Sequence, residues 1–188
     1  MPFSESELLS PVVGLIEKIK PTSVLDVGVG FGVYGHLCRT NLEHVNLFEW
    51  CDESARKREK EEWQVRIVGV EAFPDYITPV HDYAYNDILI GDARDVLPEI
   101  EEQFELVLAV EILEHLEKAD GERFLEQIRR ISSKDAIVTT PKEFIPQDYP
   151  ANPYENHRSL WSKEDLHGAG FKTVWDAGTS WIAILGDH

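Results

Sequence analysis

The residues of this sequence that are best placed for chemistry are one aspartate and three glycines. The apolar run Val24–Val27 contains Asp26 and is followed by Gly28, Gly30 and Gly32 at alternate positions. A strand that turns through glycines into a helix leaves bare backbone against which a nucleotide-like ligand can lie. The spacing therefore predicts a ligand site at the end of this strand.

Three further acids follow apolar runs later in the chain. Glu71, Asp92 and Glu111 are spaced about 20 residues apart, which is about one strand–helix unit. Because the carboxyl ends of parallel strands meet at one edge of a sheet, we expect these acids to lie around the glycine turn.

Glu71 is the expected ribose ligand, because a carboxylate offers two coplanar oxygens to a pair of hydroxyl groups. Glu49 is the alternative, since it stands nearer to the usual one-unit distance from Asp26. Choosing Glu49 would leave Val65–Glu71 as a surplus strand, so we favour Glu71.

Asp92 is expected to accept a hydrogen bond from the exocyclic amine of adenine, with the backbone N–H of Ala93 beside it. The alternative role for Asp92 is to cap the turn that follows. One carboxylate can do both.

Asp26 separates two classes of ligand. A dinucleotide would place a doubly anionic pyrophosphate over the glycine turn, where the nearby carboxylate would repel it. S-Adenosylmethionine carries an ammonium and a sulfonium group, which a carboxylate attracts. The charge therefore favours a cationic adenosine derivative.

Apolar runs and helical spacings alternate along the chain. We expect helices near residues 12–19, 33–40, 74–84 and 113–131, and strands near 24–27, 65–70, 87–90, 104–110, 136–140, 171–175 and 181–185. The link between the last two strands is too short for a parallel crossover, so this pair must be antiparallel. The pattern predicts an α/β fold, a three-layer Rossmann-like sandwich with a mostly parallel seven-stranded sheet and a C-terminal antiparallel hairpin.

Two segments interrupt this regular pattern within the single domain expected for residues 1–188. Residues 41–64 look like an insertion, and its mostly charged part, 52–62, predicts a solvated helix or loop. The alternative is a flap over the ligand with Trp50 or Trp63 folded inward. Residues 141–161 are rich in proline and predict a long loop at the ligand edge that holds the acceptor. His157 in this loop is the candidate general base, and an ordinary loop histidine is the alternative.

Composition excludes several classes of function. The 18 basic and 35 acidic residues give a formal charge of −17, which disfavours binding to a nucleic acid backbone. The two cysteines have no zinc-finger spacing, so we predict no disulfide framework and no metal site. No stretch approaches the roughly 20 apolar residues of a membrane span, and the N-terminus is acidic rather than basic. We therefore expect no membrane partner and a cytoplasmic location.

The sequence resembles the class I S-adenosylmethionine-dependent methyltransferases of the seven-strand Rossmann-like type, in particular the type-11-like branch. The Asp-x-Gly-x-Gly-x-Gly loop that begins at Asp26 matches that family, and the run Glu111-Ile-Leu-Glu114-His115 resembles its fourth-strand motif. The resemblance implies S-adenosyl-L-methionine as cofactor. It implies that the glycines face the methionine part, that Asp26 lies near its amino group and that Glu111 lies beside the cofactor.

The resemblance also implies that His115 borders the reaction centre, although a structural histidine is an equally good interpretation. The sequence thus predicts methyl transfer to a small-molecule acceptor. Two alternatives remain, an NAD(P)-dependent Rossmann oxidoreductase and a non-catalytic S-adenosylmethionine-binding protein. A homodimer is compatible with the sequence, which does not fix the oligomeric state.

Overall fold

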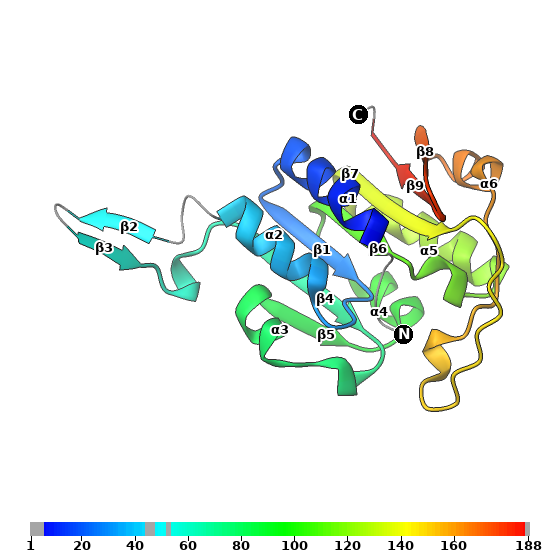
Figure 1. The fold of residues 1–188 in the computed structure, drawn as a ribbon, viewed down its shortest axis with the longest axis horizontal. Coiled ribbons are helices and arrows are strands. Elements are labelled where there is room, and N and C mark those ends of the chain that lie inside the picture. The colour runs from blue at the N-terminus through cyan, green and yellow to red at the C-terminus, as the bar shows by residue number, and fades with distance from the viewer. Residues whose placement is uncertain (1–5, 44–47, 52–53, 187–188) are drawn as a thin grey trace.

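The computed structural model describes residues 6–43, 48–51 and 54–186. A seven-stranded sheet with the order β5-β4-β1-β6-β7-β9-β8 runs through its centre (Figure 1). Its strands are β1 (Ser23–Val27), β4 (Arg66–Glu71), β5 (Asp87–Ile90), β6 (Phe104–Val110), β7 (Ser132–Pro141), β8 (Thr173–Ala177) and β9 (Ser180–Ile184). The first five strands pair in parallel, whereas β9 is antiparallel to both β7 and β8. The predicted sheet and its C-terminal hairpin are confirmed.

Helices cover both faces of the sheet, which confirms the three layers. One face carries α1 (Ser6–Ile19), α2 (Val33–Glu43) and α3 (Pro79–Ala84), and the other carries α4 (Ala93–Glu99) and α5 (Lys118–Ile131). A short helix, α6 (Lys163–Gly168), precedes the hairpin. Helix α1 extends further toward the N-terminus than predicted, because Leu8 is also fully buried and lengthens its apolar stripe.

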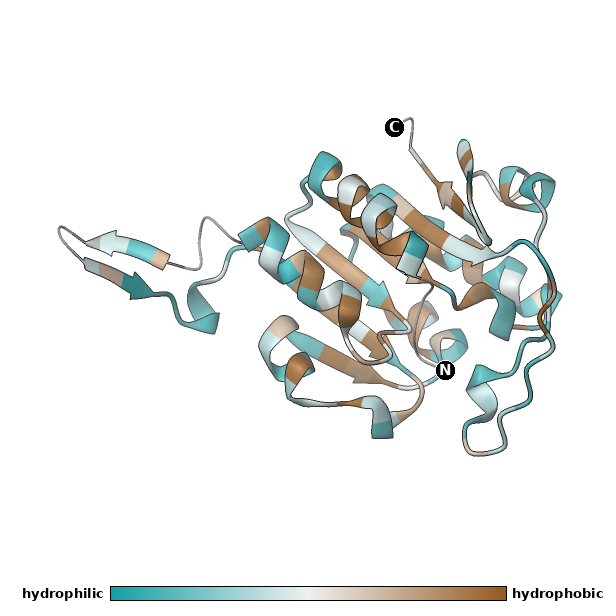
Figure 2. Ribbon diagram, in the orientation of Figure 1, coloured by the Kyte–Doolittle hydropathy of each residue, from teal (hydrophilic) through white to brown (hydrophobic). Residues whose placement is uncertain are grey.

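Alternation along β1 decides which side chains face which helices. Val24 packs with the α1–α3 layer, whereas Leu25 and Val27 pack with the α4–α5 layer. Since successive side chains of a strand point to opposite faces, Asp26 lies on the same face as Val24. Figure 2 shows hydrophobic residues concentrated on these central strands.

The charged segment 52–62, expected to be a solvated helix or loop, contains a strand. Helix α2 continues to Glu43, and β2 (Phe48–Cys51) then pairs with β3 (Ser54–Lys57) as an antiparallel hairpin outside the main sheet. The short 3-10 helix η1 (Lys60–Glu62) leads back to β4. Cross-strand pairing, which a count of charges does not detect, accounts for the difference. The hairpin projects away from the rest of the molecule (Figure 1).

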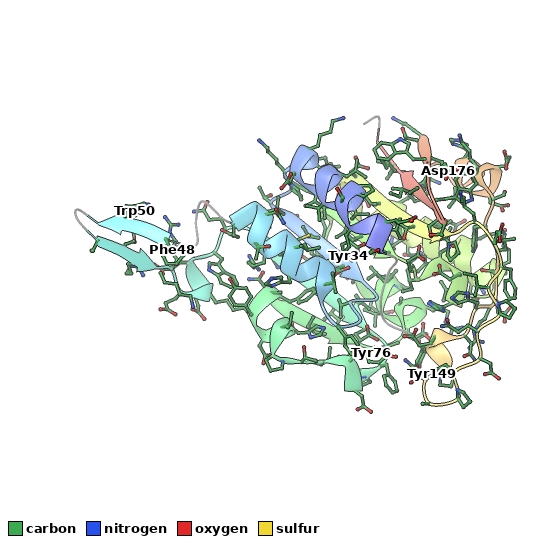
Figure 3. The ribbon with its side chains drawn as sticks, in the orientation of Figure 1. Tyr34, Phe48, Trp50, Tyr76, Tyr149 and Asp176 are labelled. Atoms are coloured by element: carbon green, nitrogen blue, oxygen red, sulfur yellow. The ribbon has the colours of Figure 1, made fainter. Side chains whose placement is uncertain are left out.

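The alternative for this segment, a flap over the ligand, is wrong as well. Trp50 on the hairpin is 81% exposed, and Figure 3 shows it with Phe48 far from Tyr76 and Tyr149 at the other end of the molecule. Trp63 packs beneath the guanidinium of Arg39, which lies 4.3 Å from its ring centroid. Neither tryptophan covers a ligand site.

After β7, residues 142–161 contain no strand and no α-helix, only the short 3-10 helix η4 (Pro153–Glu155). Two other 3-10 helices stand at strand ends, η2 (Pro74–Tyr76) after β4 and η3 (Leu113–His115) after β6. The loop runs beside both of them, at the edge of the sheet where the parallel strands end (Figure 1).

Candidate functional site

A cavity of about 410 Å³ opens at the carboxyl ends of the parallel strands. Its wall combines the glycine turn, the acids at the strand ends and the 141–161 loop. Of the predicted site residues, it includes Gly28, Gly30, Glu71, Asp92, Ala93, Glu111, His115 and His157. The topology of the sheet therefore brings together residues that lie up to 129 positions apart in the chain.

The glycine turn needs its glycines. Gly28, Gly30 and Gly32 have φ values of 77°, 51° and 80°, a left-handed conformation in which a side chain costs about 1–2 kcal/mol. A Cβ at Gly28 would stand 2.9 Å from the Cδ1 of Ile112. Gly28 and Gly30 present bare backbone to the cavity, whereas Gly32 is not part of its wall and lies against His81.

Glu71 ends β4 next to this turn. Its Oε2 accepts a hydrogen bond of 2.9 Å from the Gly30 backbone N–H, and its Oε1 accepts one of 2.8 Å from the N–H of Phe73. The carboxylate also lines the cavity, where a ribose hydroxyl can donate to it. Burial raises the pKa of Glu71, while the N–H groups of Phe73, Gly30 and Ala72 oppose that rise.

Glu49, the alternative, lies elsewhere. It sits on the projecting hairpin and forms an ion pair of 2.6 Å with Arg56. It is not part of the cavity wall.

Asp26 is nearly fully buried and accepts a hydrogen bond of 2.6 Å from the hydroxyl of Tyr85. Burial raises the pKa of Asp26 to about 6. The same Tyr85 hydroxyl accepts a hydrogen bond from the N–H of Gly35 in α2. Asp26 thus contacts the helix layer behind the glycine turn, because the strand alternation points it there, and it is not part of the cavity wall.

Asp92 caps helix α4 and also lines the cavity. Its Oδ1 accepts a hydrogen bond of 2.9 Å from the N–H of Arg94, and its Oδ2 pairs with the Arg94 guanidinium at 2.6 Å. The hydrogen bond from the Arg94 side chain is the main reason that the pKa of Asp92 is lowered. The capping role is therefore present, and Asp92 and Ala93 also line the cavity.

Glu111 follows β6 with a φ of 53°, an uncommon conformation for a residue with a side chain. The hydroxyl of Thr139 on β7 holds it, since that oxygen accepts from the Glu111 N–H at 3.0 Å and donates to Glu111 Oε1 at 2.8 Å. Strain of this kind concentrates at ligand sites. The strained backbone turns the chain so that η3 follows along the cavity wall.

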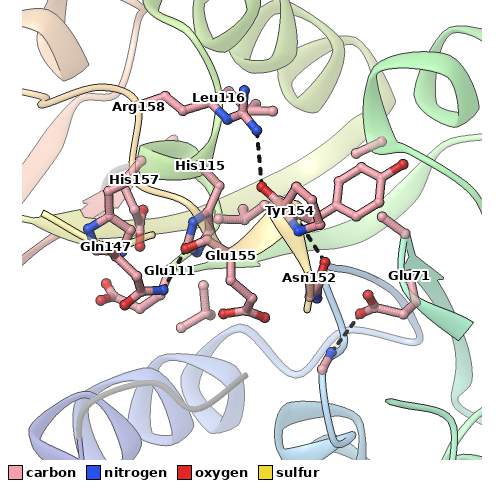
Figure 4. A pocket seen from close by; sticks show the side chains of 18 of the residues that line it. Glu71, Glu111, His115, Leu116, Gln147, Asn152, Tyr154, Glu155, His157 and Arg158 are labelled. Atoms are coloured by element: carbon pink, nitrogen blue, oxygen red, sulfur yellow. Dashed lines mark hydrogen bonds between the residues drawn. The ribbon is translucent and has the colours of Figure 1, made fainter. Parts of the chain in front are cut away.

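His115 and His157 lie side by side although 42 residues separate them, with ring centroids 4.9 Å apart (Figure 4). Burial, and then the charge of His157, lower the pKa of His115 to about 4. Burial also lowers the pKa of His157. Both imidazoles are neutral near pH 7, so each has a lone pair that can accept a proton or bind a cation.

The 141–161 loop is fixed across the cavity by one tyrosine. The hydroxyl of Tyr76 in η2 donates to Glu155 Oε1 at 3.0 Å and accepts from the side-chain amide of Asn152 at 2.9 Å. Burial is the main cause that raises the pKa of Tyr76 to about 12. At the opposite side, the backbone N–H groups of Arg158 and Ser159 donate to the carbonyl of Glu114.

Sequence reasoning gave no role to Tyr76, Asn152 or Glu114, all of which line the cavity. Glu114 is part of the Glu-x-x-Glu-His run, which is the sequence feature that could have pointed to it. Its burial became known only from the structure. Burial and the neighbouring charge of Glu111 raise the pKa of Glu114 well above its usual range. Tyr76 and Asn152 had no sequence signal, because their contact depends on how the loop folds back.

The cavity wall fits an adenosine-type cofactor. Gly28 and Gly30 contribute bare backbone to the cavity wall, and the carboxylate of Glu71 lies on the same wall. Glu71, Asp92 and Glu111 surround this space with carboxylates, which attract a cation and repel a pyrophosphate. Donor set and backbone therefore both suit S-adenosylmethionine.

The comparisons with known proteins agree with this fit. A family model described as a methyltransferase domain matches residues 25–139. A comparison with curated proteins gives no match.

Several solved structures share the fold. An O-methyltransferase family protein from Burkholderia thailandensis is 11% identical with a TM-score of 0.65, and the alignment covers 94% of this chain and 55% of that one. The PH0226 protein from Pyrococcus horikoshii OT3 is 18% identical with a TM-score of 0.63, covering 95% and 87%. Magnesium protoporphyrin IX methyltransferase (ChlM) from Synechocystis PCC 6803, solved with bound SAH, is 12% identical with a TM-score of 0.57, covering 95% and 81%.

This chain thus spans about half the length of the Burkholderia protein, at 55%, and most of the other two. At these identities the similarity to solved structures shows the fold alone. The match to the family model shows the family. The matched residues, 25–139, include the glycine turn, Glu71, Asp92 and the Glu111–His115 run. The chain therefore belongs to the class I methyltransferases of the type-11-like family, whose methyl donor is S-adenosylmethionine.

Proposed function

We propose that the protein transfers the methyl group of S-adenosylmethionine to a small-molecule acceptor held between the histidine pair and the 141–161 loop. The observation that carries the proposal is one continuous cavity whose wall includes both the glycine turn with its acids and the pair His115–His157. Its volume of about 410 Å³ is in the range of small-molecule sites.

The cofactor half of the cavity is assigned by its donors and acceptors. The backbone of Gly28 and Gly30 faces the methionine part, Glu71 holds the ribose, and Asp92 with the Ala93 N–H holds the adenine. Asp26 supports the turn from behind through Tyr85 and adds negative charge near the methionine ammonium. Glu111 lies at the border between the two halves.

The acceptor half is formed by side chains of η3 and the loop. Tyr154 supplies an aromatic wall and Arg158, held by the Pro153 carbonyl at 3.0 Å, is a possible anion contact. His157 is the candidate base, because its neutral imidazole can accept the proton of an acceptor hydroxyl or amine. His115 lies against it and borders the reaction centre.

The bound cofactor supplies a methyl carbon that is activated by a positively charged sulfur. The residues of the chain align the acceptor with that carbon and exclude water, which is the larger part of the catalytic task in such a displacement. The Tyr76 contacts to Asn152 and Glu155 keep the loop over the cavity for this purpose.

The test combines binding with turnover. Isothermal titration calorimetry with S-adenosylhomocysteine is expected to give one site per chain, and a fluorescence titration with NADH is expected to show no binding. A panel of small hydroxyl, carboxyl and amine acceptors is then screened for release of S-adenosylhomocysteine. Binding of NADH instead would support an oxidoreductase, and cofactor binding without turnover on any acceptor would support a binding protein; either result overturns the proposal.

A further inference from the structure

Glu114, His115 and His157 offer three ligand atoms to one region of the cavity wall. One carboxylate oxygen and one imidazole nitrogen from each ring all lie within 4.8 Å of one another. Glu114 is 3% exposed, and its buried Oε2 has no well-aligned hydrogen bond within the described residues, although the Thr140 hydroxyl lies beside this carboxyl group. A buried carboxylate oxygen without a well-aligned donor is costly. The cluster therefore has the geometry and the unmet need of a cation site.

The backbone holds the three residues together. Glu114 and His115 are consecutive in η3, and His157 is brought beside them because the N–H groups of Arg158 and Ser159 donate to the Glu114 carbonyl at 2.8 and 3.1 Å. This contact fixes the loop to η3 independently of any ligand. The cluster is thus built by the fold and is not a chance meeting of exposed side chains.

Each imidazole uses one nitrogen for the backbone and leaves the other available. The Nδ1 of His115 lies 3.4 Å from the carbonyl oxygen of Asn156, and His157 has a backbone hydrogen bond with Ile145. In each ring, the nitrogen that contacts the backbone carries the proton. The other nitrogen then has a lone pair that can bind a metal ion. Histidine ligands of metal ions are commonly oriented by such contacts.

The charge around the cluster also suits a cation. The carboxylates of Glu111 and Glu155 act electrostatically on Glu114, and both line the same cavity. A positive ion would offset the repulsion among these acids.

We propose that Glu114, His115 and His157 bind a divalent first-row transition-metal cation such as Zn²⁺ or Mn²⁺. Two imidazole nitrogens and one carboxylate oxygen suit these ions, whereas Mg²⁺ and Ca²⁺ prefer all-oxygen sites. Metal–ligand bonds of about 2.0–2.2 Å bring ligand atoms closer together than the 4.8 Å limit of the present cluster, so binding of the ion draws the three side chains inward.

The site has a consequence for the acceptor, and this consequence rests on the proposed function. Three protein ligands leave coordination positions that face the cavity. An oxygen atom of the acceptor fits such a position, next to the space assigned to the methyl group. The acceptor class favoured by this geometry is therefore a hydroxyl- or carboxyl-bearing molecule.

The test begins with chelator-treated protein, to which ZnCl₂, MnCl₂, CoCl₂ and MgCl₂ are added in separate calorimetric titrations. We expect one equivalent of Zn²⁺ and of Co²⁺ to bind, with visible absorption of the Co²⁺ complex and no saturable Mg²⁺ binding. His157→Asn and Glu114→Gln are each expected to weaken Zn²⁺ binding at least ten-fold. His36→Asn, which changes an exposed histidine of α2 outside the cavity, is the matched control and is expected to bind like the unchanged protein.

Binding of S-adenosylhomocysteine and the thermal unfolding of every variant are measured in parallel. Retained cofactor binding shows that a variant is folded, so that its loss of metal reports on the ligand itself. Absence of stoichiometric Zn²⁺, Mn²⁺ or Co²⁺ binding to the unchanged protein, or unchanged binding in both site variants, overturns the cation site and leaves the proposed methyl transfer intact. Metal binding without any binding of S-adenosylhomocysteine supports the cation site and overturns the proposed methyl transfer.

Discussion

The carboxylate of Glu71 accepts a hydrogen bond of 2.9 Å from the backbone N–H of Gly30. This contact joins the end of β4 to the turn after β1, the neighbouring strand of the sheet. It connects Glu71, the expected ribose ligand, to the glycine turn that is expected to face the methionine part of the cofactor. Of the two acids that the sequence left in competition, Glu71 lines the cavity and Glu49 does not.

Glu71→Gln is expected to weaken binding of S-adenosylhomocysteine by roughly 10- to 100-fold, because a hydrogen bond to a charged group contributes about 1.5–3 kcal/mol. Glu49→Gln is the matched control and is expected to bind normally, since Glu49 contacts Arg56 on the hairpin. Calorimetry on both variants checks the prediction. Normal binding by Glu71→Gln together with weak binding by Glu49→Gln would reverse the assignment.

Gly28→Ala is expected to lower stability by about 1–2 kcal/mol, because alanine disfavours the left-handed backbone, and to abolish cofactor binding by placing a methyl group against Ile112. Gly14→Ala in α1 has open space around it and is expected to be neutral or to gain up to about 1 kcal/mol. Chemical denaturation and calorimetry distinguish the two. A Gly28→Ala protein of unchanged stability and affinity would show that the turn is not strained.

Asp26→Asn is expected to raise stability at neutral pH. The folded-state pKa of Asp26 is raised from 3.8 to about 6, so the folded protein keeps this proton to higher pH than the unfolded chain does. Stability contributed by the protonated form is therefore lost as pH rises from about 4 to 6, to a total of about 3 kcal/mol.

The measurement for Asp26 is urea unfolding of both proteins between pH 4 and pH 8. The difference in unfolding free energy between Asp26→Asn and the unchanged protein should grow with pH through this window and then level off. Asp75→Asn, at an exposed position of η2, should show no such growth. A constant difference at every pH would contradict the raised pKa of the buried Asp26.

Tyr76→Phe is expected to loosen the 141–161 loop, because the phenol oxygen bonds both Asn152 and Glu155. Hydrogen exchange of the loop amides should accelerate, and the KM for the acceptor should rise. The free energy of unfolding of the whole protein should change little. Tyr83→Phe is the control, since the Tyr83 ring packs against Trp63 away from the cavity. Unchanged exchange of the loop in Tyr76→Phe would show that other contacts hold it.

Within the described ranges, no helix has the length and apolar character needed to cross a bilayer.

The sequence by itself determined the layered sheet, the antiparallel final hairpin and the glycine turn. These features follow from local patterns: apolar runs, the length of a link between strands, and a backbone conformation that glycine tolerates. It also located Glu71, Asp92 and Glu111 at the site edge, because the ends of parallel strands meet there.

Only the tertiary structure decided which side chains meet. Asp26 faces Tyr85, His115 faces His157, and Tyr76 holds a loop that follows it by some 70 residues. Each of these contacts joins segments that are distant in sequence, and local periodicity carries no information about such pairs. The hairpin β2–β3 was missed for a different reason. Its charges resemble those of a solvated loop, whereas pairing between its two adjacent strands stabilises it. Burial, which leaves the Glu114 Oε2 without a well-aligned hydrogen bond and gives the two histidines their neutral form, likewise arises only when the chain has folded.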